Sequence, residues 1–225
     1  MTQDEAKRTA ARRALEFVED GMALGLGSGT TSAMFIQELG ERVKGGLKVH
    51  GIATSAASQK LAESLSIPMT TFEETPALDL AIDGADEVGP GLALIKGGGG
   101  ALLREKIVES AAKKFIVIAD GSKLVKQLGK FPLPVEVVKM ALPLVTHRLE
   151  ALGLNPKLRH HKDGSVYLTD ENNFILDCSA GVIADPAKTA ADIRSIVGVV
   201  EHGLFLNMAS FALIASDQGV VEVGR

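Results

Sequence analysis

Residues 22–39 read MALGLGSGTTSAMFIQEL, and this stretch decides the fold. The apolar run at 22–26 ends in glycines and predicts a strand, while 31–39 predicts a helix. A tight glycine turn between a strand and a helix is typical of a parallel α/β sheet. Because the N-terminus of a helix presents unpaired N–H groups, the loop at 28–31 is a candidate anion site.

Two common nucleotide-binding motifs do not fit this loop. A Rossmann dinucleotide motif needs a third glycine at position 30, where Thr30 stands. A Walker A motif needs Gly-Lys before the Ser or Thr, and that lysine is absent. The loop therefore predicts a phosphate site but gives little support to NAD or ATP. A plain strand-to-helix turn remains the alternative.

The alternation of strand and helix continues through the first half of the chain. Phe115 begins the run FIVIA, a continuous apolar strand of the kind found where both faces of a sheet are covered. These elements predict a doubly wound, mostly parallel, Rossmann-like sheet. Further strands are predicted at 48–53, 78–82, 211–215 and 220–223, and helices at 4–19, 101–112 and after the cap residue Ser55.

The pattern changes at residues 131–134, which read FPLP. The arrangement that follows is similar to a βαββαβ, ferredoxin-like unit. We therefore expect a Rossmann-like domain formed by 1–131 and 206–225, and a second α+β domain at 132–205. The second domain is predicted to have strands at 135–138, 157–159, 166–169, 174–177 and 199–205, and helices at 144–152 and 187–196.

Composition excludes several classes of protein. The 225 residues contain one cysteine, Cys178, which rules out an intramolecular disulfide framework and cysteine-rich zinc sites. A net charge of -4 argues against a general nucleic-acid or membrane binder, and the absence of Trp argues against a base-stacking surface. No apolar run has the length of a signal core or a membrane span, so we expect a cytoplasmic protein.

Two further motifs follow predicted strands. Residues 83–87 read DGADE, and ligands bind at this edge of an open α/β sheet. Carboxylates so close together repel each other, so one can keep its proton near neutrality and the pair can supply an acid and a base. The alternative is a solvated acidic turn.

The segment at 96–106 reads KGGGGALLREK and places four glycines between a cation and a helix. The glycines let the backbone approach a ligand and present N–H groups to it. Glu105 falls in the first turns of that helix, where a surface glutamate is the alternative. Lys123 follows a strand in ADGSK and could meet a phosphate. The five histidines show no spacing that predicts a metal site.

In this order, GLGSGTT, DGADE, KGGGGALLREK, ADGSK and FPLPVEV resemble the type A ribose-5-phosphate isomerase family. The likeness runs from about residue 22 to near the C-terminus. It implies an inserted ferredoxin-like lid and the interconversion of ribose 5-phosphate and ribulose 5-phosphate. It also implies a homodimer or dimer of dimers that uses no metal and no other cofactor.

The resemblance also implies roles for individual residues. Glu105 matches the catalytic base, and the developing oxyanion would be stabilised by Lys96 with nearby N–H groups. Asp83 and Asp86 are candidates for the proton transfers of ring opening, and Lys7 is a further cation that we do not assign. The expected substrate site consists of Ser28, Gly29, Thr30, Thr31, Asp83, Gly84, Ala85, Asp86, Lys96, Gly97, Gly98, Gly99 and Lys123.

This sequence departs from the family pattern at a few positions. Its phosphate loop reads Ser-Gly-Thr-Thr where Thr-Gly-Ser-Thr is usual, which keeps the hydroxyl groups. Gly100 and Leu103 stand where alanine and threonine are common, so packing at the start of the helix is expected to differ. Two other functions stay open, a sugar-phosphate sensor domain and a coenzyme A transferase. A sensor would normally carry a DNA-binding helix pair, and we see no room for one before Met22.

Overall fold

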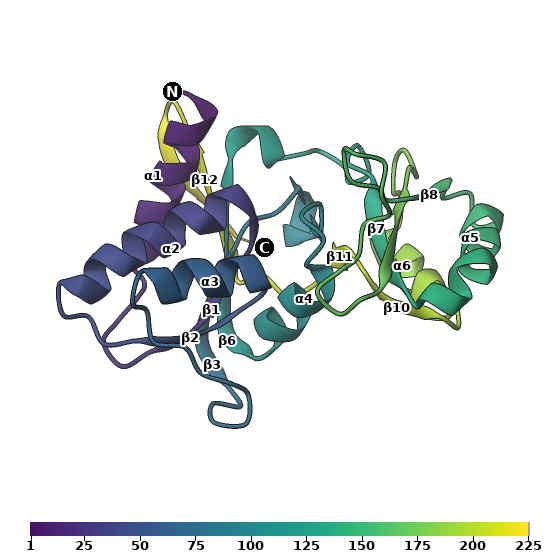
Figure 1. The fold of residues 1–225 in the computed structure, drawn as a ribbon. Helices are drawn as coiled ribbons and strands as arrows, with labels where there is room; N and C mark the ends of the chain where they lie inside the picture. The colour runs from purple at the N-terminus through teal and green to yellow at the C-terminus, as the bar shows by residue number, and fades with distance from the viewer. Residues whose placement is uncertain (225) are drawn as a thin grey trace.

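The structure is a computed structural model that describes residues 1–224. Figure 1 shows a domain with a central sheet beside a second domain, drawn mainly in green, that carries its own helices. None of the helices within residues 1–224 is long and apolar enough to cross a membrane. The first domain contains α1 (Gln3–Leu15), β1 (Ala23–Leu26), α2 (Gly29–Lys44), β2 (His50–Ala53), α3 (Ala56–Ser64), β3 (Leu78–Asp83), α4 (Leu102–Ser110), β6 (Ala112–Asp120), β12 (Phe211–Ser216) and β13 (Gly219–Val223).

The central sheet has six strands in the order β13-β12-β6-β3-β1-β2. Every neighbouring pair is parallel except β12 with β13, which form an antiparallel hairpin at one edge. The mostly parallel sheet and the return of the C-terminal strands to it were both predicted from the sequence, and both are confirmed.

Both faces of this sheet are buried, which explains the continuous apolar run in β6. Ile116 and Ile118 pack in the core formed with α1 and α2, which lie in front of the strands in Figure 1. Phe115 and Val117 point to the opposite face, because successive side chains of a strand alternate. A small sheet of β4 (Glu87–Val88), β5 (Leu94–Ile95) and β11 (Leu204–Phe205) supplies part of the cover there.

The second domain is a four-stranded antiparallel sheet in the order β10-β7-β9-β8. Its chain order is β-α-β-β-α-β, so it has the ferredoxin-like topology that the sequence predicted. The elements are β7 (Leu133–Val137), α5 (Leu142–Ala151), β8 (Pro156–Leu158), β9 (Phe174–Cys178), α6 (Pro186–Arg194) and β10 (Val199–His202).

Three short 3₁₀ turns complete the elements of the described residues. The first domain contains η1 (Pro90–Leu92) and η2 (Gly121–Lys123), and the second contains η3 (Lys139–Ala141).

Two predictions about strands were wrong, and one small sheet was not predicted at all. Residues 166–169 form no strand, because this segment leaves a turn capped by Asp163 and makes only an isolated bridge to His160. The run predicted at 199–205 breaks at Gly203 into β10 and β11, which belong to different sheets. The small sheet was not predicted, because strands of two residues show no periodicity.

Helix bounds also differ from the predictions. Thr2 and Glu5 form the expected capping box, yet α1 ends at Leu15 and not at residue 19. Helix α2 begins at Gly29 and continues to Lys44, beyond the predicted 31–39. Ser55 caps α3 as expected, since its hydroxyl accepts the Ser58 N–H.

Gly203 lies where two backbones approach closely. Its N–H donates to the Pro134 carbonyl at 2.8 Å, and its carbonyl accepts the Lys96 N–H at 2.9 Å. A Cβ atom at this position would lie 2.3 Å from the Lys96 carbonyl oxygen. The residue must therefore be small for the second domain to meet the strand that precedes Lys96.

We expect Gly203→Ala to lower the free energy of unfolding by about 1–3 kcal/mol, because overpacking forces the backbone apart. Urea unfolding followed by circular dichroism measures this loss. Gly121→Ala is the matched control, since its Cβ atom would meet nothing nearer than the Ala215 carbonyl at 3.7 Å. Equal unfolding midpoints for the two variants would contradict the close approach.

Candidate active site

The carboxyl ends of the central strands open into a pocket of about 140 Å³. The loops after β1, β3, β5 and β6 meet there, at the edge of the sheet where α/β proteins bind ligands. The sequence predicted fourteen of its lining residues: Ser28, Gly29, Thr30, Thr31, Asp83, Gly84, Ala85, Asp86, Lys96, Gly97, Gly98, Gly99, Glu105 and Lys123. Gln3 and Lys7 of α1 also line it.

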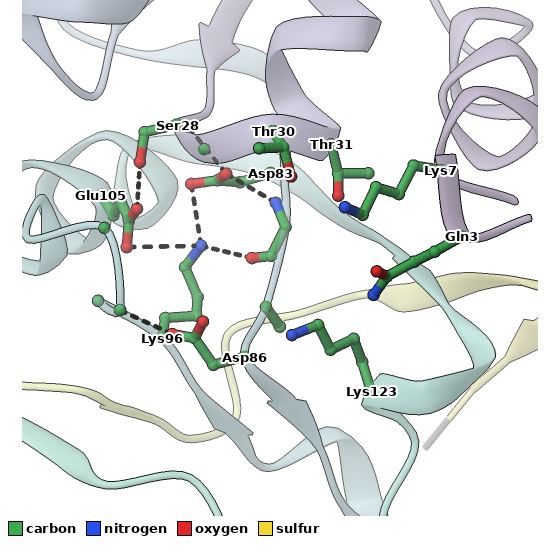
Figure 2. A pocket seen from close by; sticks show the side chains of 16 residues that line it. Gln3, Lys7, Ser28, Thr30, Thr31, Asp83, Asp86, Lys96, Glu105 and Lys123 are labelled. Atoms are coloured by element: carbon green, nitrogen blue, oxygen red, sulfur yellow. Dashed lines mark hydrogen bonds and ion pairs between the residues drawn. The ribbon is translucent and has the colours of Figure 1, made fainter. Parts of the chain in front are cut away.

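The ammonium group of Lys96 lies at the centre of the pocket floor, with its side chain only 2% exposed. It is 2.9 Å from Asp83 Oδ2, 3.1 Å from Glu109 Oε1 and 3.6 Å from Glu105 Oε2. It also donates a hydrogen bond of 2.6 Å to the Gly84 carbonyl. Figure 2 shows the interactions with Asp83, Glu105 and the Gly84 carbonyl converging on the nitrogen.

Charge keeps this buried lysine ionised. Burial by itself would lower the pKa of Lys96, but Asp83, Glu105 and Glu109 raise that pKa well above its ordinary value. One positive charge faces three carboxyl groups, so not all of them can ionise together. The pKa of Glu109 is raised well above its usual range by burial and by its acidic neighbours, although Lys96 opposes the shift.

Asp83 joins the first glycine loop to the centre of the pocket. Its Oδ1 atom accepts hydrogen bonds from the Ser28 N–H at 2.9 Å, the Gly84 N–H at 2.7 Å and the Ser32 hydroxyl at 2.7 Å. Its other oxygen pairs with Lys96. With both oxygens occupied, this carboxylate holds the loop, the start of α2 and the lysine in one arrangement.

Glu105 is buried in the first turns of α4. Its Oε1 atom accepts a hydrogen bond from the Ser28 hydroxyl, so that serine makes no side-chain cap for α2. Burial raises the pKa of Glu105 to about 7, helped by the charge of Asp83 and opposed by Lys96. Near neutrality this group is populated both as carboxylate and as carboxylic acid.

Asp86 provides a second carboxyl group with a shifted pKa. Burial raises its pKa, although the Gly98 N–H, which donates to Oδ2 at 2.7 Å, and the nearby Lys96 act in the opposite direction. The sequence predicted that a carboxyl of the DGADE motif would keep its proton more readily. The structure gives Asp86 such an environment and Glu105 a stronger shift.

Cations gather at the other end of the pocket. Figure 2 shows Lys7 and Lys123 across from Glu105, with Thr31 beside them. Gln3 lies on the same face of α1 as Lys7 because the two are four residues apart. The N-terminus of α2 opens at this end and adds its N–H groups and helix dipole.

Sequence reasoning missed two residues of this site and left a third unassigned. Glu109 could have been found from its position, because residues four apart share a helix face and Glu105 is one turn earlier. Gln3 carries no such signal until α1 is known to lie over the pocket. Lys7 was noted in the sequence but not assigned, and it now lines the cationic end.

Other candidate groups lie away from the pocket. His160 and His161 are exposed, and Cys178 is buried, where its surroundings raise the pKa of the thiol to about 12. The sequence predicted both positions, a surface location for the two histidines and a buried thiol. Within residues 1–224 we find no group of three or more His, Cys, Asp or Glu side chains that could hold a metal ion.

The arrangement suits proton transfer on a small anionic substrate. A carboxyl group that titrates near neutrality can both take and return a proton. An ammonium beside it and glycine N–H groups can stabilise negative charge that develops on oxygen. The cations at the far end can bind an anionic group of the same molecule.

Known proteins match this chain over almost its whole length. The model of the family described as ribose 5-phosphate isomerase A (phosphoriboisomerase A) matches residues 50–219. A ribose-5-phosphate isomerase A of Roseiflexus castenholzii is 53% identical, with 96% of this chain and 94% of the relative covered. One from Parvibaculum lavamentivorans is 49% identical, with 97% of each chain covered.

Solved structures give the same result. Ribose 5-phosphate isomerase A from Methanocaldococcus jannaschii superposes with a TM-score of 0.95 at 40% identity, covering 100% of both chains. A D-ribose-5-phosphate isomerase described as a complex with phospho-erythronic acid reaches 0.97 at 39% identity, again covering 100% of both chains. With its sequence, its fold and its pocket in agreement, this chain belongs to the ribose 5-phosphate isomerase A family.

Proposed function

We propose that this chain interconverts D-ribose 5-phosphate and D-ribulose 5-phosphate through an enediolate, as in the non-oxidative pentose phosphate pathway. The observation that carries the proposal is the buried Glu105 carboxyl, with a pKa of about 7, beside the ammonium of Lys96. The names of its relatives support the same substrate. The comparisons support neither a sugar-phosphate sensor nor a coenzyme A transferase.

The two ends of the pocket suggest how the substrate is oriented. The phosphate would bind at the cationic end, between Lys7, Lys123 and the N-terminus of α2. Carbons 1 and 2 would then lie toward Glu105 and Lys96. The relative in complex with phospho-erythronic acid, a phosphorylated sugar acid, supports a site of this kind.

In this orientation, Glu105 acts as the base. Its carboxylate takes the proton from C2 of the open-chain aldose, and the electron pair of that bond forms the enediolate double bond. The negative charge that develops on the carbonyl oxygen is stabilised by Lys96 and by the glycine loop, where the Gly99 N–H has no acceptor within residues 1–224. The protonated Glu105 then returns the proton to C1, and a proton passes from the O2 hydroxyl to O1, so that C2 becomes the carbonyl carbon of the ketose and C1 carries the hydroxyl. These steps use no cofactor.

The ring form of the substrate must open before the isomerisation. The sequence offered Asp83 and Asp86 for the proton transfers this requires. We favour Asp86, because its pKa is raised and it lines the pocket with one oxygen bonded to Gly98. Asp83 has both oxygens engaged, so we assign it the task of holding Lys96 in place.

We further propose that residues 132–205 act as a lid and assembly domain, with 1–131 and 206–225 forming the catalytic domain. Apolar side chains are exposed on the second domain, with Met140 at 93% and Val197 at 83%. The Val138 N–H donates to the Gly198 carbonyl, which places these two segments side by side. Such a patch supports a homodimer or dimer of dimers. A cytoplasmic location stays a prediction.

A coupled assay for ribulose 5-phosphate formation tests the proposed reaction directly. We expect full activity after dialysis against EDTA, because the mechanism needs only side chains and backbone groups of this chain. Activity that disappears with the chelator and returns with a divalent cation would contradict the metal-free mechanism. Absence of turnover under every condition would contradict the isomerase itself.

The pH dependence of kcat/KM tests the role of Glu105. The base must be unprotonated in the free enzyme, and its pKa is about 7. We therefore expect kcat/KM to fall about tenfold for each pH unit below this value and to level off above it. A flat profile between pH 5.5 and 8 would contradict the assignment.

Glu105→Gln removes the base but keeps the shape of the side chain, so kcat should fall by roughly 10²–10⁴-fold. Substrate binding, measured by calorimetry, should change little. Glu150→Gln, at an exposed position of α5, is the control and should behave like the unmodified protein. A Glu105→Gln variant with near-normal kcat would show that another group is the base.

Lys123→Ala tests the phosphate end of the pocket. The loss of one cation should raise KM roughly 10-fold or more, because a charge-assisted bond to phosphate is lost, while kcat changes little. Lys126→Ala is the control, since Lys126 is exposed and lies outside the pocket. An unchanged KM for Lys123→Ala would exclude a phosphate contact at this lysine.

A further inference from the structure

We propose that Arg159 and Tyr167 of the second domain are positioning residues that fix the orientation of the glycine loop at 97–100 for the isomerisation. The inference rests on the proposed function, in which N–H groups of this loop stabilise the oxyanion. It is carried by hydrogen bonds that hold three consecutive peptide groups of the loop from the side of the second domain.

The peptide group between Gly97 and Gly98 is fixed at both ends. Its carbonyl oxygen accepts a hydrogen bond from Arg159 Nη1 at 3.1 Å. Its N–H donates to Asp86 Oδ2 at 2.7 Å. Because the peptide group is planar, these two bonds determine its orientation. A residue from each domain thus holds one end of the same rigid unit.

The next peptide group carries the N–H that matters for the reaction. Its carbonyl, that of Gly98, accepts a second bond from Arg159 Nη1 at 3.1 Å. Its N–H, that of Gly99, finds no acceptor within residues 1–224, and Gly99 lines the pocket. In a planar trans peptide the N–H points opposite to the carbonyl. Holding the carbonyl toward Arg159 therefore directs this N–H away from the second domain.

Tyr167 holds the third peptide group. Its hydroxyl donates to the Gly99 carbonyl at 3.1 Å, and the N–H of the same peptide, from Gly100, donates to Gly97. A Cβ atom on Gly100 would lie 2.1 Å from the Tyr167 oxygen, and the φ angle there is +87°. The glycine at this position therefore leaves the space that Tyr167 occupies.

External bonds are needed because the internal bond from the Gly100 N–H to the Gly97 carbonyl does not by itself fix the Gly98 and Gly99 carbonyls. Glycine has no side chain to pack and loses more conformational freedom than any other residue when it is ordered. Arg159 is itself held firmly, since its Nε donates to Asp177 Oδ2 at 2.8 Å and its guanidinium forms an ion pair with that carboxylate. These contacts connect the glycine loop through Arg159 to Asp177 of strand β9.

The test compares Arg159→Ala with Arg148→Ala, which removes an exposed arginine of the same domain that makes no contact with the loop. We expect kcat of Arg159→Ala to fall roughly 100-fold, the effect of a small displacement of reacting groups, with KM changed less than about threefold. Guanidinium chloride at tens of millimolar should restore part of kcat. Tyr167→Phe should lower kcat by a smaller factor, and Arg148→Ala should leave it unchanged.

Thermal unfolding of each variant separates positioning from simple tethering of the domains. A folded Arg159→Ala protein with unchanged kcat overturns the proposal. A loss of kcat that follows the folded fraction and is not restored by guanidinium also overturns it. The isomerase activity of the unmodified protein is measured first, so failure of the proposed function is recognised independently of any variant.

Discussion

The rest of the site depends on one buried ammonium group, that of Lys96. A charge removed from water must be compensated by the protein, and Asp83, Glu105 and Glu109 supply the compensation. Three carboxylates carry more negative charge than a single lysine can balance. Glu105 and Glu109 therefore keep their protons to a higher pH than an ordinary glutamate does. The near-neutral pKa of Glu105 follows from this excess together with its burial.

The position of Lys96 is in turn set by the small sheet. Strand β5 ends immediately before the lysine, and it is paired with β4 on one side and β11 on the other. Asp83 comes from the end of β3, and the two glutamates come from α4. Three separate segments, β3, β5 and α4, therefore have to meet before the lysine has its three carboxyl partners. This arrangement keeps Glu105, the proposed general base, and Lys96, the proposed oxyanion donor, at a fixed separation.

The sequence predicted the fold and most of the candidate site because both leave local signals. Apolar runs such as 115–119 mark strands, and glycines at 25–31 and 96–100 mark the turns that follow strands. The signals fail where a contact is made between distant segments. Nothing near Arg159 indicates that its side chain reaches Gly97, sixty-two residues away. The run from Val199 to Phe205 was likewise predicted as one strand, although Gly203 divides it between two sheets.

The close backbone contact at Gly203 also ties the two domains together. The core of the second domain includes Ile95 and Leu204 of the small sheet along with Leu133 and Leu176. Excision of residues 132–205 would therefore remove β11, one of the two partners of β5, and expose hydrophobic side chains next to the backbone before Lys96. The second domain is an insertion in the chain of the sheet domain, but its hydrophobic core includes side chains of the small sheet. We therefore expect that neither domain keeps its fold when it is transferred alone into another protein.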